Sequence, residues 1–413
     1  MIKDRKTIAY MVSYSSIFNQ GPWRNSIKLF SEKEGYEIII YQFRDGRIDK
    51  RDPITKHHII QVPYPFVCKL FMYLFKSFFR LFKYIRLYKF SKTGDSIDYF
   101  IKGYYYILFA LFQKKLRNAD ILIVGDPPSM VAAKYLSKFK KKKIVFWQLE
   151  LLLTRELNNA VQRYFKKLEI KESSNIICGL EFGEKRAEIF RKENKIPSKI
   201  PIFSIPNAPI GKPKIKRKYY FNDYFGIPHE KKIILAAGSV SNDFNDEMRH
   251  FWESIEKWPD NWVYIMHSSV KLYSLQNPRI PKFLLNKKIF LHNKPLPFTK
   301  VNIIYSSCDI GFIPIRIGGE INNNLYYSEL SLGKIFHFTH SGVPIISRNL
   351  YGYKELIERN KIGFTFNNLT EINNLIKTII NMEYKMRVNC IEFSYKYKFE
   401  NHHKKLENII ENL

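Results

Sequence analysis

Residues 334–346, Lys-Ile-Phe-His-Phe-Thr-His-Ser-Gly-Val-Pro-Ile-Ile, are the most informative stretch of this chain. Their apolar spacing predicts a helix that passes through a Gly-x-Pro turn into a buried strand. Lys334 would lie near the helix start, where free backbone N–H groups and the positive end of the helix dipole favour an anion. The stretch therefore indicates a phosphate site, and taken alone it fits an ordinary helix–strand unit with a solvated lysine equally well.

Length and composition indicate two globular domains. The chain has 413 residues, of which 45% are hydrophobic and 26% are charged, and this length suits two domains with separate cores. No uncharged apolar run reaches the roughly 18 residues needed to cross a bilayer. The first thirty residues lack the apolar core and cleavage site of a signal peptide, so we expect a cytosolic protein. The four cysteines have no CxxC spacing, which favours buried thiols over zinc sites or disulfides.

The net charge of +30, from 68 Lys and Arg against 38 Asp and Glu, implies an anionic partner. Nucleic acid, anionic lipid and phosphorylated substrates all meet this requirement, and charge alone does not choose among them. A general bias of the chain toward lysine is the alternative explanation.

Strands and helices alternate along the chain, which predicts an α/β fold. Strands are expected at residues 7–13, 36–43, 121–124, 143–147 and 175–179, with a loop around 21–25 before the first helix. A linker is expected at 206–218, where proline, glycine and lysine are dense. A further strand at 232–237 then opens the second domain. The chain has neither a GxGxxG nor a GxxxxGK[ST] motif, so dinucleotide binding and a P-loop are not expected.

Residues 66–90 predict a helix that lies on a membrane. Lys69, Lys76, Arg80 and Lys83 form a narrow basic stripe, and aromatic and aliphatic side chains occupy the rest of the helix. Residues 99–112 add a second aromatic segment flanked by lysines. Aromatic rings at the headgroup level with lysines that reach anionic lipid are typical of interfacial attachment. A buried helical hairpin of the N-terminal domain is the alternative.

Several stretches resemble, in the same order, those of GT-B glycosyltransferases of the retaining family 4 type. That family usually reads Lys-[Leu/Ile]-Phe-Glu-Tyr-x-x-x-Gly-x-Pro-[Val/Ile]-Ile at the opening stretch. The chain matches this pattern at Lys334, Phe336, Gly342, Pro344, Ile345 and Ile346. Further matches are Asp126-Pro127-Pro128, Glu150-Leu151, Ile205-Pro206-Asn207-Ala208, Gly238-Ser239-Val240, the run 309–314 and Gly352-x-x-Glu355-Leu356-Ile357. The resemblance covers most of the chain and implies two Rossmann-like domains that face each other across a cleft.

Three positions depart from the family pattern. The family's Glu-x7-Glu pair reads Glu329-x7-His337 here, so that a histidine stands at the position that binds the nucleotide ribose. A neutral imidazole can still accept a hydrogen bond from a ribose hydroxyl, and a histidine packed within its helix is the alternative. Leu149 replaces a family histidine that lies close to the transferred sugar. No lysine or arginine follows Gly238 in residues 241–246.

The resemblance implies a set of site residues. Lys334 and Glu329 are the expected catalytic residues, and Lys334 would also bind the diphosphate. The other expected nucleotide-sugar contacts are Gly238, Ser239, His337, Gly342 and Pro314. The expected acceptor-side residues are Gly21, Arg24, Asn25, Asp126 and Glu150. No metal ligand is expected, since Asp243-x-x-Asp246 lacks the Asp-x-Asp spacing of GT-A enzymes.

The domain boundaries follow from the same resemblance. Residues 1–208 would form the acceptor domain, with the membrane-facing insertion at about 64–117. Residues 209–392 would bind the nucleotide sugar, and residues 393–413 would form a helix that crosses back to the first domain. The implied reaction is metal-independent transfer of a hexose, with retention, from a nucleotide diphosphate to a hydroxyl. The expected acceptor is a lipid-linked glycan at the inner face of the cytoplasmic membrane, and the expected membrane contact runs through residues 66–90.

A second function from another class remains open at this point. The three departures also fit a non-catalytic basic protein that binds membranes or nucleic acid on a degenerate GT-B scaffold. Nucleic-acid binding would require basic and aromatic residues along one groove, whereas here they concentrate on an apolar helix. Lipid is therefore favoured over nucleic acid as the anionic partner.

Overall fold

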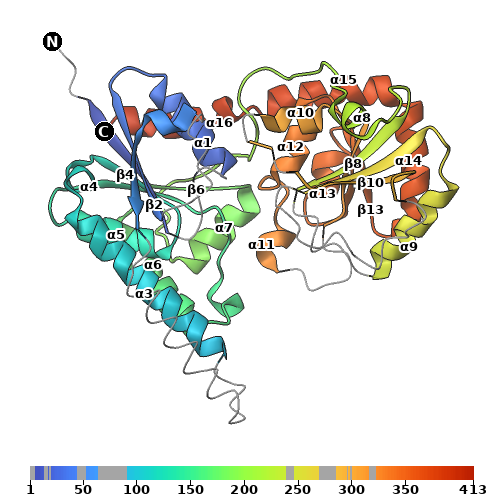
Figure 1. Ribbon diagram of the computed structural model, residues 1–413. Coiled ribbons are helices and arrows are strands. Elements are labelled where there is room, and N and C mark those ends of the chain that lie inside the picture. Colours follow the sequence, from blue (N-terminus) through green and yellow to red (C-terminus); the bar gives the residue numbers. More distant parts are fainter. Residues whose placement is uncertain are drawn as a thin grey trace, which may run out of the picture. The chain divides into compact units, whose positions relative to one another are not determined.

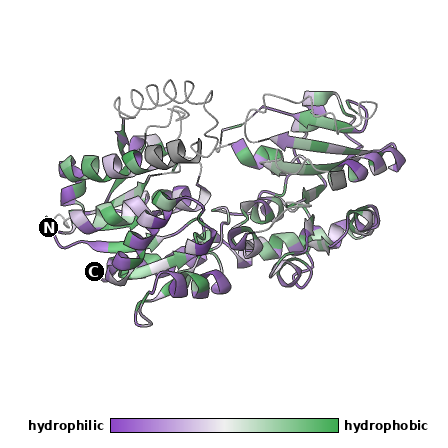
Figure 2. Cartoon of the chain, turned by 90° about the horizontal axis from the view of Figure 1, so that it is seen from below, coloured by the Kyte–Doolittle hydropathy of each residue, from purple (hydrophilic) through white to green (hydrophobic). Residues whose placement is uncertain are grey.

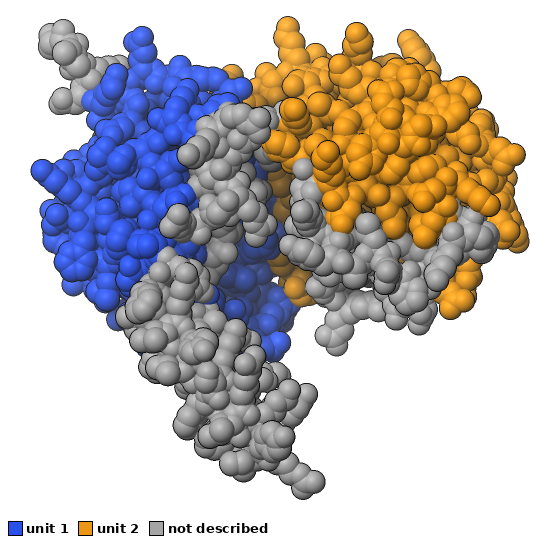
Figure 3. Space-filling model, viewed as in Figure 1, with its two compact units in different colours: residues 1–205 blue, residues 206–413 orange. Residues whose placement is uncertain are grey.

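The computed structural model describes residues 5–13, 17, 20–43, 53–63, 91–238, 246–268, 285–294, 296–297, 300–315 and 322–413. The chain forms two compact units, unit 1 (Met1–Ile205) and unit 2 (Pro206–Leu413), shown in Figure 3. Residues 66–90, where the membrane-facing helix is expected, lie outside the described ranges.

Unit 1 is built on a parallel sheet with the strand order β3-β2-β1-β4-β5-β6-β7 (Figure 1). This order continues the 3-2-1-4-5-6 arrangement of Rossmann folds. The strands are β1 (Lys6–Val12), β2 (Tyr36–Phe43), β3 (His58–Val62), β4 (Ile121–Val124), β5 (Lys143–Trp147), β6 (Cys178–Glu181) and β7 (Ile202–Ser204). Its described helices are α1 (Gly21–Ser31), α3 (Ser91–Phe112), α4 (Lys114–Asn118), α5 (Pro127–Leu136), α6 (Ala160–Glu172) and α7 (Glu184–Glu193).

Both faces of this sheet are covered, which is why its strands read as continuous apolar runs. On one face, Ala9 and Met11 of β1 belong to a core cluster shared with α3, α5 and α6. On the other face, Tyr10 contacts Trp23 of α1 with ring centroids 5.7 Å apart. Figure 2 colours each residue by its hydropathy, and hydrophobic stretches, in green, recur along the strands and helices.

Helix α3 corrects part of the membrane interpretation. Tyr106, Ile107 and Ala110 of this helix are buried in the core of unit 1. One face of residues 99–112 therefore packs inside the N-terminal domain, as the alternative interpretation expected. The opposite face remains exposed, with Phe112 79% and Leu108 54% accessible. None of the described helices combines the length and apolarity that crossing a bilayer requires.

Unit 2 repeats the same topology, with the parallel strand order β10-β9-β8-β11-β12-β13. The strands are β8 (Lys232–Gly238), β9 (Trp262–Ser268), β10 (Ile289–His292), β11 (Ile310–Ile313), β12 (Ile345–Arg348) and β13 (Gly363–Phe366). The described helices are α8 (Tyr220–Phe225), α9 (Asp246–Ser254), α10 (Val301–Tyr305), α11 (Asn323–Tyr326), α12 (Gly333–His340), α13 (Tyr353–Ile357), α14 (Ile372–Asn381), α15 (Glu383–Lys396) and α16 (Phe399–Glu411).

The two faces of the second sheet are also filled. Ile234, Tyr264 and Phe312 share one core cluster with α9 and α14. On the other face, Gly311 of β11 allows the Phe338 ring of α12 to approach so closely that a Cβ would lie 2.6 Å from it. The two Rossmann-like folds that the sequence predicts are therefore confirmed.

The expected linker is attached to unit 2 rather than free. The backbone amide of Lys214 donates to the carbonyl of His340, and that of Lys218 donates to the carbonyl of Ser306. Arg217 forms an ion pair with Asp309. The basic run 212–218 therefore packs as part of unit 2. Helix α16 also belongs to unit 2, and its contact with the first domain stays a prediction.

Candidate functional site

The carboxyl ends of β8 and β11 mark the topological switch point of unit 2, because the strand order reverses direction between these neighbours. Ligands of open α/β sheets bind outside the carboxyl ends of strands at such points. Gly238 ends β8 with φ +108°, and the end of the Lys334 side chain lies over it. A Cβ on Gly238 would lie 2.5 Å from Lys334 Cε and 2.9 Å from Nζ. The structure thus brings together two residues that the sequence placed 96 positions apart.

Lys334 is the second residue of α12, as expected from the opening stretch. The N-cap residue, Leu332, is aliphatic and makes no side-chain hydrogen bond to the first turn of this helix. Backbone N–H groups at a helix start and the nearby ammonium group together favour an anion. Gly342 follows the helix with φ +68°, and β12 begins at Ile345. The arrangement therefore matches an anion site between the switch point and the start of α12.

Asn207 positions the turn that leads into α12. Its backbone N–H donates to the carbonyl of Leu330 at 2.8 Å, and its side-chain amide donates to the carbonyl of Ser331 at 2.9 Å. A Cβ on Gly333 would lie 3.0 Å from the same amide nitrogen. The sequence pointed to this residue only as part of a family motif, and its contact with the α12 turn was not anticipated.

Glu329 lies in the same turn, beside the loop that follows β12. Gly352 has φ +77°, and a Cβ there would lie 2.9 Å from Glu329 Cγ. The hydroxyls of Ser328 and Tyr353 hydrogen-bond at 2.8 Å. These contacts fix Glu329 beside the loop that follows β12 at the carboxyl edge of the sheet. Pro314, which follows β11, is buried.

His337 lies one turn after Lys334 and stacks on Tyr305 of α10, with ring centroids 4.9 Å apart and planes 12° apart. Burial, with a smaller effect of His340, lowers the pKa of His337 to about 4. The imidazole is therefore neutral near pH 7. This is the geometry of a packed helix histidine, and its contact with a ribose stays a prediction. Ser239 lies outside the described residues.

The switch point of unit 1 lies between β1 and β4. Asp126 spans it, because its Oδ2 accepts from the backbone N–H of Ser13 at 2.5 Å while its Oδ1 accepts from that of Ser129 at 3.1 Å. The latter bond caps α5. Asp126 therefore has a structural role, because it joins the end of β1 to the start of α5. Its contact with an acceptor stays a prediction.

Gly21, Arg24 and Asn25 lie in α1 rather than in a loop, and this corrects the sequence interpretation. Helix α1 begins at Gly21 with Pro22 in its first turn, a position where a proline needs no backbone donor. Arg24 and Asn25 are each 7% exposed. The first turn of α1 follows the carboxyl end of β1 in the chain, and an acceptor contact for these residues remains a prediction.

Buried polar groups gather where β5 and β6 end. Gln148 follows β5 and is 1% exposed, yet neither its amide nitrogen nor its amide oxygen hydrogen-bonds to any residue that the structure describes. Arg186 pairs with Glu181 at 2.9 Å and donates to the carbonyl of Leu149 at 3.3 Å. Glu150 is exposed. Sequence reasoning missed both residues, because Gln148 stands at the unspecified position of a family motif and Arg186 lies outside the motifs.

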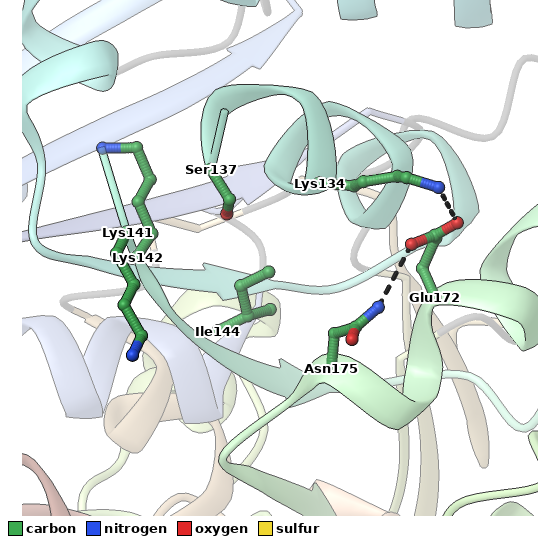
Figure 4. Close-up of a pocket in the computed structure, with 7 residues that line it drawn as sticks. All are labelled: Lys134, Ser137, Lys141, Lys142, Ile144, Glu172 and Asn175. Carbon is green, nitrogen blue, oxygen red and sulfur yellow. Dashed lines mark hydrogen bonds and ion pairs between the residues drawn. The ribbon is translucent and has the colours of Figure 1, made fainter. Parts of the chain in front are cut away.

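A pocket of about 270 Å³ lies at the opposite edge of the unit 1 sheet, near the amino ends of β5 and β6 (Figure 4). Lys134 and Asn175 both direct their nitrogen atoms at Glu172. Lys142 donates to the carbonyls of Arg117 and Ala119, and burial lowers its pKa to about 8. Two of the three lysines that line the pocket, Lys134 and Lys142, thus already have their ammonium groups bound, so this pocket is a poor candidate for the functional site.

Comparisons with known proteins agree with this architecture. Residues 322–406 match the family described as glucosyltransferase 3-like, C-terminal domain. HepE of Anabaena in complex with UDP is similar over 99% of this chain and 100% of its own, with 9% identity and a TM-score of 0.62. Sucrose-phosphate synthase from Thermosynechococcus elongatus is similar over 99% of both chains, with 11% identity and a TM-score of 0.66.

WaaG, a glycosyltransferase involved in lipopolysaccharide biosynthesis, is similar over 98% of this chain and 99% of its own, with 12% identity and a TM-score of 0.63. The comparison with curated proteins gives no significant match. Within the described ranges, no three His, Cys, Asp or Glu side chains are grouped to hold a metal ion. The chain therefore has the two-domain GT-B fold of glycosyltransferases, and its second unit contains a glucosyltransferase 3-like segment.

Proposed function

We propose that this protein is a glycosyltransferase that moves a hexose from a nucleotide diphosphate sugar to a hydroxyl group of a glycan acceptor. The observation that carries the proposal is the position of Lys334 over Gly238, at the switch point of unit 2 and at the start of α12. The donors of related structures support it, since HepE is described in complexes with UDP and with UDP-glucose.

In this proposal the diphosphate lies between Gly238 and the first turn of α12. Negative charge builds on the diphosphate as the bond from the anomeric carbon to its oxygen breaks. The Lys334 ammonium and the N-terminal amides of α12 stabilise that charge, and such preorganised electrostatic stabilisation is usually the largest single contribution to catalysis. The acceptor hydroxyl forms the new bond to the anomeric carbon, and its proton passes to the departing phosphate. Glu329 lies beside the transferred sugar, no metal is required and the configuration is retained.

Binding of the donor tests this proposal directly. Wild-type protein should be stabilised by UDP and by one UDP-, GDP- or CMP-linked sugar in a thermal-shift assay, because a ligand at a hundred times its dissociation constant contributes about 2.7 kcal/mol. Lys334→Ala should remove most of this stabilisation. Lys377→Ala, which removes an exposed lysine of α14 in the same unit, should leave it unchanged. If no nucleotide sugar is bound or hydrolysed, the enzyme proposal fails and the non-catalytic scaffold takes its place.

We further propose that the acceptor is lipid-linked, that it serves surface polysaccharide or glycolipid synthesis, and that the protein lies on the inner face of the cytoplasmic membrane. The net charge of +30 and the exposed apolar side chains of α3 support attachment to anionic lipid. Helix α3 ends with Leu108 and Phe112 exposed, and Lys114 and Lys115 follow at once. This combination suits an interface of headgroups and acyl chains.

Vesicle flotation tests the membrane proposal. Vesicles that contain phosphatidylglycerol should carry the protein, and vesicles of pure phosphatidylcholine should carry much less. The double variant Leu108→Ser/Phe112→Ser should reduce flotation with the anionic vesicles, whereas Tyr384→Ser, at an exposed aromatic of unit 2, should not. Equal flotation with both vesicle types would refute attachment through anionic lipid.

A further inference from the structure

Three tyrosine rings pack against one another at the carboxyl edge of the unit 2 sheet. Tyr326 and Tyr327 come from α11 and the residue after it, and Tyr351 comes from the loop that follows β12. The ring centroids of Tyr327 lie 4.9 Å from those of both Tyr326 and Tyr351, and Tyr326 and Tyr351 are 6.0 Å apart. These three residues are called the tyrosine cluster below. Helix α11 is labelled in Figure 1.

Two of the three rings of the tyrosine cluster are exposed, and Tyr327 is half-buried. Tyr326 and Tyr351 keep 41% and 42% of their surface accessible. None of the three hydroxyls hydrogen-bonds to another residue in the described part of the chain. Neighbouring exposed aromatic rings present an apolar surface with polar hydroxyl groups at its edge, which suits an amphipathic ligand. Three rings cover far less than the roughly 800 Å² that each partner buries in a stable protein interface, so a small ligand suits the cluster better than a protein.

The cluster continues directly from the candidate catalytic turn. Two short segments, 326–329 and 351–353, lie side by side, because Tyr327 contacts Tyr351, Ser328 hydrogen-bonds to Tyr353, and Glu329 packs on Gly352. The cluster is therefore next to Glu329 along the sheet edge.

The strand order gives the spacing between the cluster and the diphosphate site. β8 carries Gly238, β11 is its neighbour, and β12 is the next strand. Neighbouring strands are about 4.8 Å apart, so the ends of β8 and β12 are separated by about 10 Å. The segment that carries Tyr351 thus follows a strand two places away from the strand that ends at Gly238.

We propose that the tyrosine cluster is an acceptor subsite in unit 2, which stacks on a pyranose ring of the glycan acceptor adjacent to the transferred sugar. This inference rests on the proposed transferase function. The C–H face of a pyranose is apolar and packs on aromatic rings, while the phenolic hydroxyls remain available to its hydroxyl groups. Tyrosine provides such contact area at low conformational cost.

Saturation-transfer NMR with methyl α- and β-glucopyranosides and methyl galactopyranosides, recorded with UDP present, tests the subsite. The double variant Tyr326→Ala/Tyr351→Ala should weaken binding of at least one pyranoside by about fivefold or more, since two aromatic contacts are lost. Phenylalanine at both positions should keep most of the binding. Tyr384→Ala, at a tyrosine that is 84% exposed and lies outside the cluster, should have no effect. Thermal melts confirm that each variant is folded.

The donor readout separates this inference from the proposed function. UDP affinity, measured by thermal shift, should be equal in the wild type and the cluster variants. A cluster variant that loses UDP affinity but keeps pyranoside binding would assign the cluster to the donor and overturn the proposal. Unchanged pyranoside binding, or no pyranoside binding by the wild type, would also overturn it. If the wild type fails to bind UDP, the proposed function itself fails, whatever the pyranoside result.

Discussion

Replacing Gly238 by alanine should separate backbone strain from the displacement of Lys334. Gly238 has φ +108°, which a side chain rarely adopts, and a Cβ there would overlap Lys334 Cε at 2.5 Å. Contacts below 3.0 Å force a neighbour to move, and the flexible end of the lysine is the group that can move. The alanine therefore strains the backbone and also pushes the ammonium away from the switch point.

The two effects have different magnitudes and different readouts. A residue with a Cβ in the left-handed region costs about 1–2 kcal/mol of stability. A charge-assisted hydrogen bond contributes about 1.5–3 kcal/mol, so a displaced ammonium should weaken UDP binding by about 10- to 100-fold. Gly211→Ala is the matched control, since Gly211 belongs to the same unit, has φ +90° and has open space where its Cβ would lie.

Urea denaturation and UDP titration of the two variants complete the test. Both variants should lose stability to a similar extent. Only Gly238→Ala should lose UDP affinity, and to nearly the extent that Lys334→Ala does. Equal UDP affinity in Gly238→Ala and Gly211→Ala would refute the assignment of Lys334 as the diphosphate contact.

Three further predictions concern buried groups. Burial lowers the pKa to about 4 in three histidines, namely His267, His337 and His340. Because the unfolded chain binds their protons below about pH 6.5, the free energy of unfolding should rise with pH between about 4 and 6.5 and level off above; urea denaturation with a stability maximum below about pH 5 would contradict this. Gln148→Leu should raise stability by about 1–2 kcal/mol, because it removes two unsatisfied buried polar atoms, and should lower transferase turnover if those atoms bind substrate; a less stable variant would refute the first part. Arg186→Met should lower the free energy of unfolding, measured by chemical denaturation, by about 3–5 kcal/mol, because it leaves the buried Glu181 carboxylate without its partner. The additional change Glu181→Gln should restore part of that free energy.

Several sheet strands were predicted because the chain reads there as a short apolar run, although the equally apolar β9 and β10 were not predicted. Residues 121–124, Ile-Leu-Ile-Val, form β4 with the expected bounds, and residues 143–147 form β5. Such runs occur because both faces of a parallel sheet are buried. The edge strand β3 was missed, since it opens with an exposed histidine and has only two fully buried residues. The start of α1 was misplaced because Gly21-Pro22 was interpreted as a turn, although proline also suits the first turn of a helix.

The candidate site was predictable in identity but not in geometry. Motif resemblance selected Lys334 and Gly238, and their approach depends on how α12 packs across the end of β8. The packing of His337 on Tyr305 was not visible either, because Tyr305 comes from a helix that carries no motif. Gln148 stands at a position that the family motif leaves unspecified, so its burial was not predicted. Long-range packing decides these features, and a single sequence encodes it only indirectly.

The chain segment that joins the two units is short and is hydrogen-bonded on both sides. The N–H of Ile205 donates to Glu181 in β6 of unit 1, whereas the N–H of Asn207 donates to Leu330 in unit 2. One residue, Pro206, separates these two anchors, and its ring fixes φ near −65°. The backbone freedom at this point is therefore limited to the few torsions that flank Pro206. Because glycine adopts many more backbone torsions than proline, Pro206→Gly is the substitution that would add the most backbone freedom to this segment.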